Sequence, residues 1–170
     1  MTRDVRILNT GSLLELSRRL RAAGGENIRS SMQRRIRRAA EPLRDDLQST
    51  MRGLDIRSQG RRTRAGGPSP NTRPLRETLA AAIRISVRTG GRPGATVWID
   101  KGRLPRDLWG VPGQLNDGRL RHPTFGNKSR SGWVNQYASP PWWDTTVRRH
   151  RPRMEQEVAR VLDDVRRRLE

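Results

Sequence analysis

The sequence predicts an α+β fold: a small antiparallel sheet of three to four strands, packed by a long kinked N-terminal helix and a C-terminal amphipathic helix. Apolar residues recur at spacings of three and four over 28–51 and again over 147–169, as on one face of a helix. Between these segments, 83–87 alternates apolar and polar residues, which is typical of a half-buried strand. A length of 170 residues fits one domain, so we assign 1–170 to a single unit.

The N-terminal part, 12–52, is predicted to be helical after an extended lead-in over 1–11. Ser12-Leu13-Leu14-Glu15 has the form of a capping box, and Gly24-Gly25 stops the short helix that it starts. Pro42 lies within the following long helix and is expected to kink it. The apolar stripe of that helix comprises Ile28, Met32, Ile36, Ala39, Ala40, Leu43, Leu47 and Met51.

A flexible loop is predicted over 53–73, where several Gly and Pro residues interrupt any apolar periodicity. The segment 74–143 should then hold the sheet and an aromatic loop region. Pro74 suits the first turn of a short helix that runs to Ala81. Strands at 83–87 and 95–100 form a hairpin across the turn at 89–94, whereas 101–120 is irregular with Trp109 as an anchor.

Aromatic residues are scarce but concentrated between positions 121 and 143. That segment holds the only Phe (Phe125), the only Tyr (Tyr137) and three of the five Trp. Large rings supply much burial per residue, so the segment is predicted to be a packing centre with a third strand over 133–137. Asp144 or Thr145 then caps the C-terminal helix, 144–170. Its predicted buried face comprises Val147, Met154, Val158, Val161, Leu162, Val165 and Leu169.

The composition is polar, with 32% hydrophobic and 31% charged residues and a mean hydropathy of -0.91. No apolar run approaches the ~18 residues that span a bilayer, and the N-terminus lacks an apolar signal core. We therefore expect no membrane association and a protein that is cytosolic when made. The absence of Cys excludes disulfides, thiolate metal sites and a Cys nucleophile.

The net charge of +19 and the pI near 11.9 are compatible with nucleic acid or with acidic protein partners. Only Lys101 and Lys128 are lysines among 36 basic residues, an Arg bias that a GC-rich genome produces without selection for binding. The Arg residues are also spread over the whole chain. These features favour a basic surface that meets acidic proteins or tolerates nearby DNA over specific DNA recognition.

No residue pattern indicates catalysis, a metal or a cofactor, so we predict that the protein is not an enzyme. Only two histidines occur: His150 is predicted to be an exposed helix residue, and His122 to bond a backbone carbonyl within a fixed turn. Asp45-Asp46 and Asp163-Asp164 are adjacent on helices, where side chains diverge by about 100°. A nuclease would need a metal-binding carboxylate set that the sequence does not offer.

One motif carries a family resemblance. Arg121-His122-Pro123-Thr124-Phe125-Gly126-Asn127 is followed by Trp133 and Gln136, then by Pro141-Trp142-Trp143 and an amphipathic helix. This order resembles the type 1 neck proteins of long-tailed phages, a family that includes gene-ten-like morphogenesis proteins, minor tail protein Z and tail-completion proteins. The chain departs from the family in its long 100–121 loop and in having two adjacent Trp where one aromatic is common.

The resemblance implies a structural virion protein of the head–tail connector (neck) or tail-completion ring, made in the host cytoplasm. Its expected partners are further copies in a sixfold ring, a head-connector or stopper protein, a tail-terminator or tail-tube protein, and genomic DNA touched non-specifically in the lumen. The alternative is a basic DNA-binding accessory protein of a phage or prophage, which would hold phosphates with loop 57–73 and helix 29–38.

Three sets of candidate residues follow. The structural box is Arg121, His122, Pro123, Phe125, Gly126, Asn127, Trp133 and Gln136, with Phe125 and Trp133 as core anchors. Its polar members either hold the loop in shape or form a subunit interface. The interface candidates are Trp109, Pro141, Trp142 and Trp143; in an extended segment one Trp of the pair would fill the core and the other would face a partner. The candidate DNA or partner contacts are Arg57, Arg61, Arg62, Arg64 and Arg73.

Overall fold

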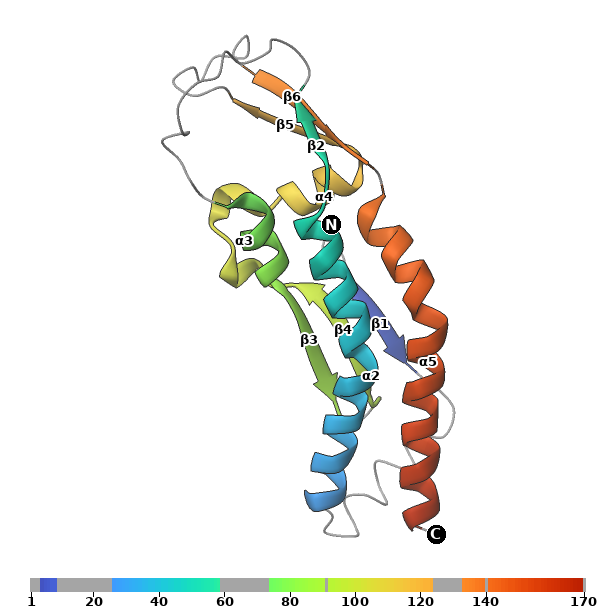
Figure 1. Ribbon diagram of the computed structural model, residues 1–170. Coiled ribbons are helices and arrows are strands. Elements are labelled where there is room, and N and C mark those ends of the chain that lie inside the picture. The colour runs from blue at the N-terminus through green and yellow to red at the C-terminus, as the bar shows by residue number, and fades with distance from the viewer. Residues whose placement is uncertain are drawn as a thin grey trace.

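The computed structural model describes residues 4–8, 26–58, 74–90, 92–123, 133–139 and 141–169. It confirms an α+β fold in which two long helices pack beside small antiparallel sheets (Figure 1). The predicted helix at 12–23 lies outside the described residues. Among the helices that the structure describes, none is long and apolar enough to cross a membrane.

The two long helices form the centre of the molecule. α2 (Glu26–Arg52) and α5 (Trp142–Leu169) run side by side in opposite directions (Figure 1). Each buries most of the apolar stripe that its sequence predicts, and Met32, Ile36 and Leu47 are fully inaccessible. Three members of the stripes are only partly buried: Ile28, Ala39 and Val147. The Leu169 side chain lies outside the described part of the structure. Burying such a side chain stabilises the fold by about 1.5–3 kcal/mol. Pro42 lies inside α2 as predicted, and Pro152 lies inside α5.

The first sheet has the strand order β1-β4-β3 and packs against α2. β3 (Ile83–Arg88) and β4 (Gly94–Ile99) form the predicted hairpin, with Ile83 opposite Ile99. The segment predicted to be an extended lead-in includes a true strand, β1 (Asp4–Leu8), which pairs with the other side of β4. Hairpin and lead-in therefore make one three-stranded sheet.

A second sheet, with the order β2-β6-β5, corrects the prediction of a single sheet. The predicted third strand exists as β6 (Trp133–Ala138), but it pairs with β2 (Ile56–Ser58) and β5 (Arg119–Pro123) and not with the hairpin. β2 lies in the predicted flexible loop, of which 59–73 is outside the described residues. Three residues are too short to show the period of two by which a strand is recognised.

The segment predicted to be irregular, 101–120, is instead largely regular. It contains short 3₁₀ turns at Lys101–Arg103 and Arg106–Leu108, followed by α4 (Val111–Asn116) and the start of β5. Gly118, with a φ of 84°, turns the chain from α4 into β5 in a conformation that favours glycine. The predicted short helix is confirmed as α3 (Leu75–Ala81), directly after Pro74.

Candidate interaction surfaces

The adjacent tryptophans do not divide between core and partner as predicted. Both are buried, with Trp142 4% and Trp143 3% exposed, and their rings meet edge to face at 5.5 Å. α5 begins at Trp142, so the pair lies in a first helical turn and not in an extended segment. Adjacent residues there diverge by about 100° instead of 180°, which lets both rings enter the core. Of this part of the motif, only Pro141 is exposed.

The start of α5 is held by a residue that the sequence analysis missed. The Oδ1 atom of Asn116 accepts hydrogen bonds from the backbone N–H groups of Trp143, at 2.8 Å, and Asp144, at 3.4 Å. Its Nδ2 atom donates to Asp144 Oδ2 at 2.9 Å. Asn116 is 3% exposed and satisfies donors that a helix start leaves open. Local patterns cannot reveal this cap because it comes from 27 residues upstream.

The second sheet exposes large aromatic side chains on its outer face. Trp133 is 41% and Tyr137 is 38% exposed, so Trp133 is not the core anchor that we predicted. Strand alternation and register place a group of basic, aromatic and amide side chains on this side of the sheet. We call it the aromatic–arginine face: Arg57, Arg119, Arg121, Trp133, Asn135 and Tyr137.

Contacts within the aromatic–arginine face fix its geometry. The guanidinium carbon of Arg121 lies 5.5 Å from the centre of the Trp133 ring, a cation–π arrangement. The Arg121 backbone N–H donates to Gln114 Oε1 at 3.1 Å, which ties the free edge of β5 to α4. Arg119, Arg121, Trp133 and Tyr137 also line a shallow hollow of about 810 Å³. Such a surface offers both apolar area and guanidinium donors.

The other box residues lie on the opposite side of the sheet, at the end of β5 or outside the described structure. His122 is in β5 opposite Val134, and so not in the predicted turn. Gln136 is half-buried on the opposite side of β6 from Trp133. Pro123 ends β5, where it pairs with Trp133. The remaining predicted residues lie outside the part of the chain that the structure describes: Phe125, Gly126, Asn127, Arg61, Arg62, Arg64 and Arg73.

Two further predicted contacts are exposed. Trp109 is 43% exposed and donates its Nε1–H to the Leu104 carbonyl at 3.2 Å, so the ring is held in place but is not the buried anchor that we expected. Arg57 is exposed on β2 and pairs with Asp55 at 2.6 Å. Trp109 thus remains available as an interface candidate, and Arg57 belongs to the aromatic–arginine face.

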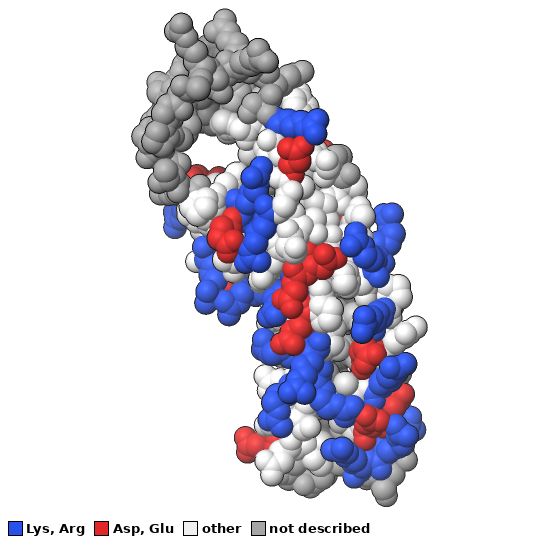
Figure 2. Space-filling view, viewed as in Figure 1, with Lys and Arg blue, Asp and Glu red and all other residues white. Residues whose placement is uncertain are grey.

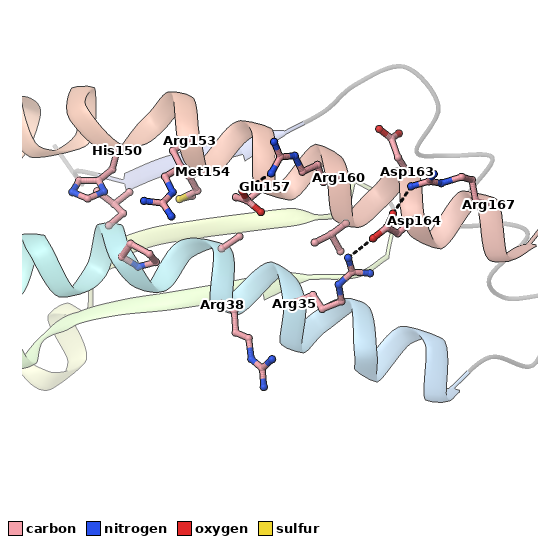
Figure 3. Close-up of a pocket in the computed structure, with 14 residues that line it drawn as sticks. Arg35, Arg38, His150, Arg153, Met154, Glu157, Arg160, Asp163, Asp164 and Arg167 are labelled. Carbon is pink, nitrogen blue, oxygen red and sulfur yellow. Dashed lines mark hydrogen bonds and ion pairs between the residues drawn. The ribbon is translucent and has the colours of Figure 1, made fainter.

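A groove of about 620 Å³ between α2 and α5 forms the second candidate surface (Figure 3). The Asp164 carboxylate bridges Arg35 of α2 and Arg167 of α5. Arg35 foremost, and then Arg167, holds the pKa of the Asp164 carboxyl below its ordinary value through hydrogen bonds. Basic side chains, with acidic ones among them, gather over this half of the two helices (Figure 2).

His150 is part of the same helix pair and is not the exposed residue that we predicted. Its Nε2 atom lies 2.7 Å from Asp46 Oδ2, and its side chain is 22% exposed. Arg149 also reaches Asp46, at 3.3 Å. The bonds through Asp46 and Asp164 therefore join α2 to α5 at two levels. In the described part of the chain, no three His, Cys, Asp or Glu side chains gather in a group that could hold a metal ion.

Comparisons of the chain with protein-family models, with curated proteins and with solved structures found no match.

Proposed function

We propose that this protein is a structural subunit of the head–tail junction of a long-tailed phage, either in the neck or in the tail-completion ring. One observation carries the interaction part of this proposal: the aromatic–arginine face, where Trp133 and Tyr137 are 41% and 38% exposed beside arginines. The resemblance of the motif at 121–143 to type 1 neck proteins supports the place of action.

The chemistry of the aromatic–arginine face suits a protein interface. Trp, Tyr and Arg are the residue types that contribute most to binding energy at protein interfaces, where they bury large areas with few rotatable bonds. Here they stand on paired strands: the Arg121 guanidinium lies over the Trp133 ring, and the Arg121 backbone is held by Gln114. A pre-organised face loses less conformational entropy on binding than a loop would.

The partners in this proposal are those that the resemblance implies. Copies of the chain form a ring, sixfold in the family, and the ring contacts a head-connector or stopper protein and a tail-terminator or tail-tube protein. A ring subunit uses two different surfaces to contact its neighbours, because a closed ring is built from head-to-tail contacts. The charge of +19 is compatible with DNA passing through the lumen by non-specific contact.

An early stop codon in the gene of the encoding phage tests this proposal. Electron micrographs of the lysate should show full heads and complete tails that remain unjoined, or tails that lack their end structure. Supplying the wild-type protein from a plasmid should restore joined particles. Joined, infectious particles made without the protein would contradict the assignment.

Binding of duplex DNA is the second candidate function, favoured by exposed arginines on α2. Arg29, Arg34, Arg37 and Arg38 are exposed along that helix. Non-specific phosphate binding of this kind has a dissociation constant of about 10⁻⁴ to 10⁻⁶ M at physiological salt and weakens steeply as salt rises. Nanomolar, sequence-selective binding in a salt titration would favour this function over the structural one.

A further inference from the structure

The groove between α2 and α5 lies on a different part of the molecule from the aromatic–arginine face and combines an apolar floor with a basic rim. We propose that it docks an acidic amphipathic helix of a different protein. This inference rests on the groove alone and does not depend on the phage assignment.

On α2 the floor of the groove is lined by small apolar residues. Ala39 is half-buried and the Pro42 ring is exposed. Leu43, Met154 and Val161 close the floor beneath them. Along α5 the lining extends from His150 to Arg167, about 26 Å at 1.5 Å per residue. A partner helix of about five turns matches that length.

The rim carries more positive than negative charge. Five arginines and three carboxylates line the groove, which leaves a formal charge of +2 with His150 neutral: Arg35, Arg38, Arg153, Arg160 and Arg167 against Glu157, Asp163 and Asp164. Arg35 and Arg167 are held by Asp164, and Arg160 by Glu157. A guanidinium has five N–H donors, so these arginines keep donors for a further acceptor.

Arg38 and Arg153 are the rim arginines for which no ion pair is found among the described residues. In Figure 3, Arg153 extends from α5 toward α2, and Arg38 extends from α2 on the side away from α5. They therefore stand on the two helices that bound the groove. Carboxylates on both flanks of a docked helix can pair with them while its apolar stripe covers Ala39 and Pro42.

Both components of the groove favour a peptide over DNA or a second copy of the chain. A phosphate backbone would leave the apolar floor uncovered. A second copy would bring another +19 of charge toward a basic rim. An acidic amphipathic helix complements the floor and the rim together, which is the usual chemistry of a helix bound in a groove.

The test uses the full-length protein and a fluorescent helical peptide of about 18 residues, roughly 27 Å long, with a Leu stripe flanked by Glu. Peptide binding is measured by fluorescence anisotropy for the wild type and for two double variants. The groove variant combines Arg38→Glu and Arg153→Glu, and the control variant combines Arg34→Glu and Arg148→Glu. The control pair lies on the same two helices, is exposed and does not line the groove. Both double variants lower the charge by four.

We expect the groove variant to weaken binding at least about tenfold and the control to change it less than about twofold. Ala39→Met fills the floor without changing the charge and should also weaken binding about tenfold, which keeps the test valid if the charge variant misfolds. Equal losses in the groove and control variants would overturn the proposal. So would equal binding of a peptide with Lys in place of Glu, or unchanged binding to Ala39→Met. If short duplex DNA displaced the peptide from the wild type and the control variant but not from the groove variant, the groove would instead be a phosphate-binding site, which would overturn the proposal.

Discussion

The two sheets have the same number of strands and the same antiparallel pairing, yet they present different outer faces. In the first sheet, the outward residues of β3 are Arg84, Ser86 and Arg88, while Ile83 and Ile85 are buried on the side of α2. Trp98 of β4, opposite Arg84, also lies on this outer face, but it is half-buried and not exposed. In the second sheet, the outward residues of β6 include Trp133 and Tyr137. A polar outer face is ordinary for a sheet covered on one side. The exposed aromatics of the second sheet are therefore the reason why we propose it as a binding surface.

The largest expected effect separates the buried tryptophans from the exposed one. Trp143→Ala should lower the free energy of unfolding by about 3–5 kcal/mol, because it opens a cavity beside Trp142 in the core. Trp133→Ala should change it by less than about 1 kcal/mol, since that ring is 41% exposed. Urea unfolding followed by circular dichroism measures both. A larger loss for Trp133→Ala than for Trp143→Ala would reverse the assignment of core and surface.

A smaller effect should follow from removing the cap that joins the second-sheet region to α5. Asn116→Ala leaves backbone donors of Trp143 and Asp144 without their acceptor, which should cost about 1–3 kcal/mol. Gln156→Ala, an exposed change within α5, is the control and should leave the free energy of unfolding nearly unchanged. Equal unfolding midpoints for the two variants would show that Asn116 does not stabilise the helix start.

The smallest effect concerns the ion pairs between the long helices. The lowered pKa of Asp164 means that its pairs with Arg35 and Arg167 stabilise the fold above the unfolded pKa of about 3.9, and that this contribution is lost as pH falls through the folded pKa. Asp164→Asn should therefore be slightly less stable than wild type at neutral pH. The difference should vanish under strong acid, because the wild-type carboxyl is then protonated too.

Thermal melting across pH, with Asp163→Asn as the adjacent control, measures this difference. Within the described residues no ion pair of Asp163 is found, so the melting temperature of Asp163→Asn should follow that of the wild type more closely across pH. A gap between wild type and Asp164→Asn that persists unchanged in acid would mean that the effect does not come from the carboxylate charge.

The sequence predicted the helices and the hairpin because their apolar residues repeat locally. The stripe from Ile28 to Met51 and the alternation over 83–87 each carry the period of the element that they form. The second sheet was not predicted as a unit, because β2, β5 and β6 come from segments far apart in the chain and β2 has only three residues. Strand pairing at that distance leaves no local pattern.

The candidate surfaces were predicted only in part for a related reason. Clustered aromatics predicted a packing centre, and Trp142 and Trp143 are buried as such a centre requires, but ring size alone could not tell that Trp133 would be exposed. That distinction depends on which strand or helix turn each residue occupies. The α2–α5 groove was missed because its lining residues, such as Arg35 and Asp164, are 129 positions apart.

The central claim is that the outer face of the second sheet is a binding surface and not part of the core. The most direct measurement compares two double variants. One combines Trp133→Ser and Tyr137→Ser on the second sheet, and the other combines Ser86→Ala and Arg88→Ser on the outer face of the first sheet. Each is supplied in place of wild type to the encoding phage, and its incorporation into particles is quantified by immunoblot. We predict that both purified variants melt like wild type and that only the second-sheet variant fails to enter particles. Normal incorporation of a folded Trp133→Ser and Tyr137→Ser protein would contradict the claim.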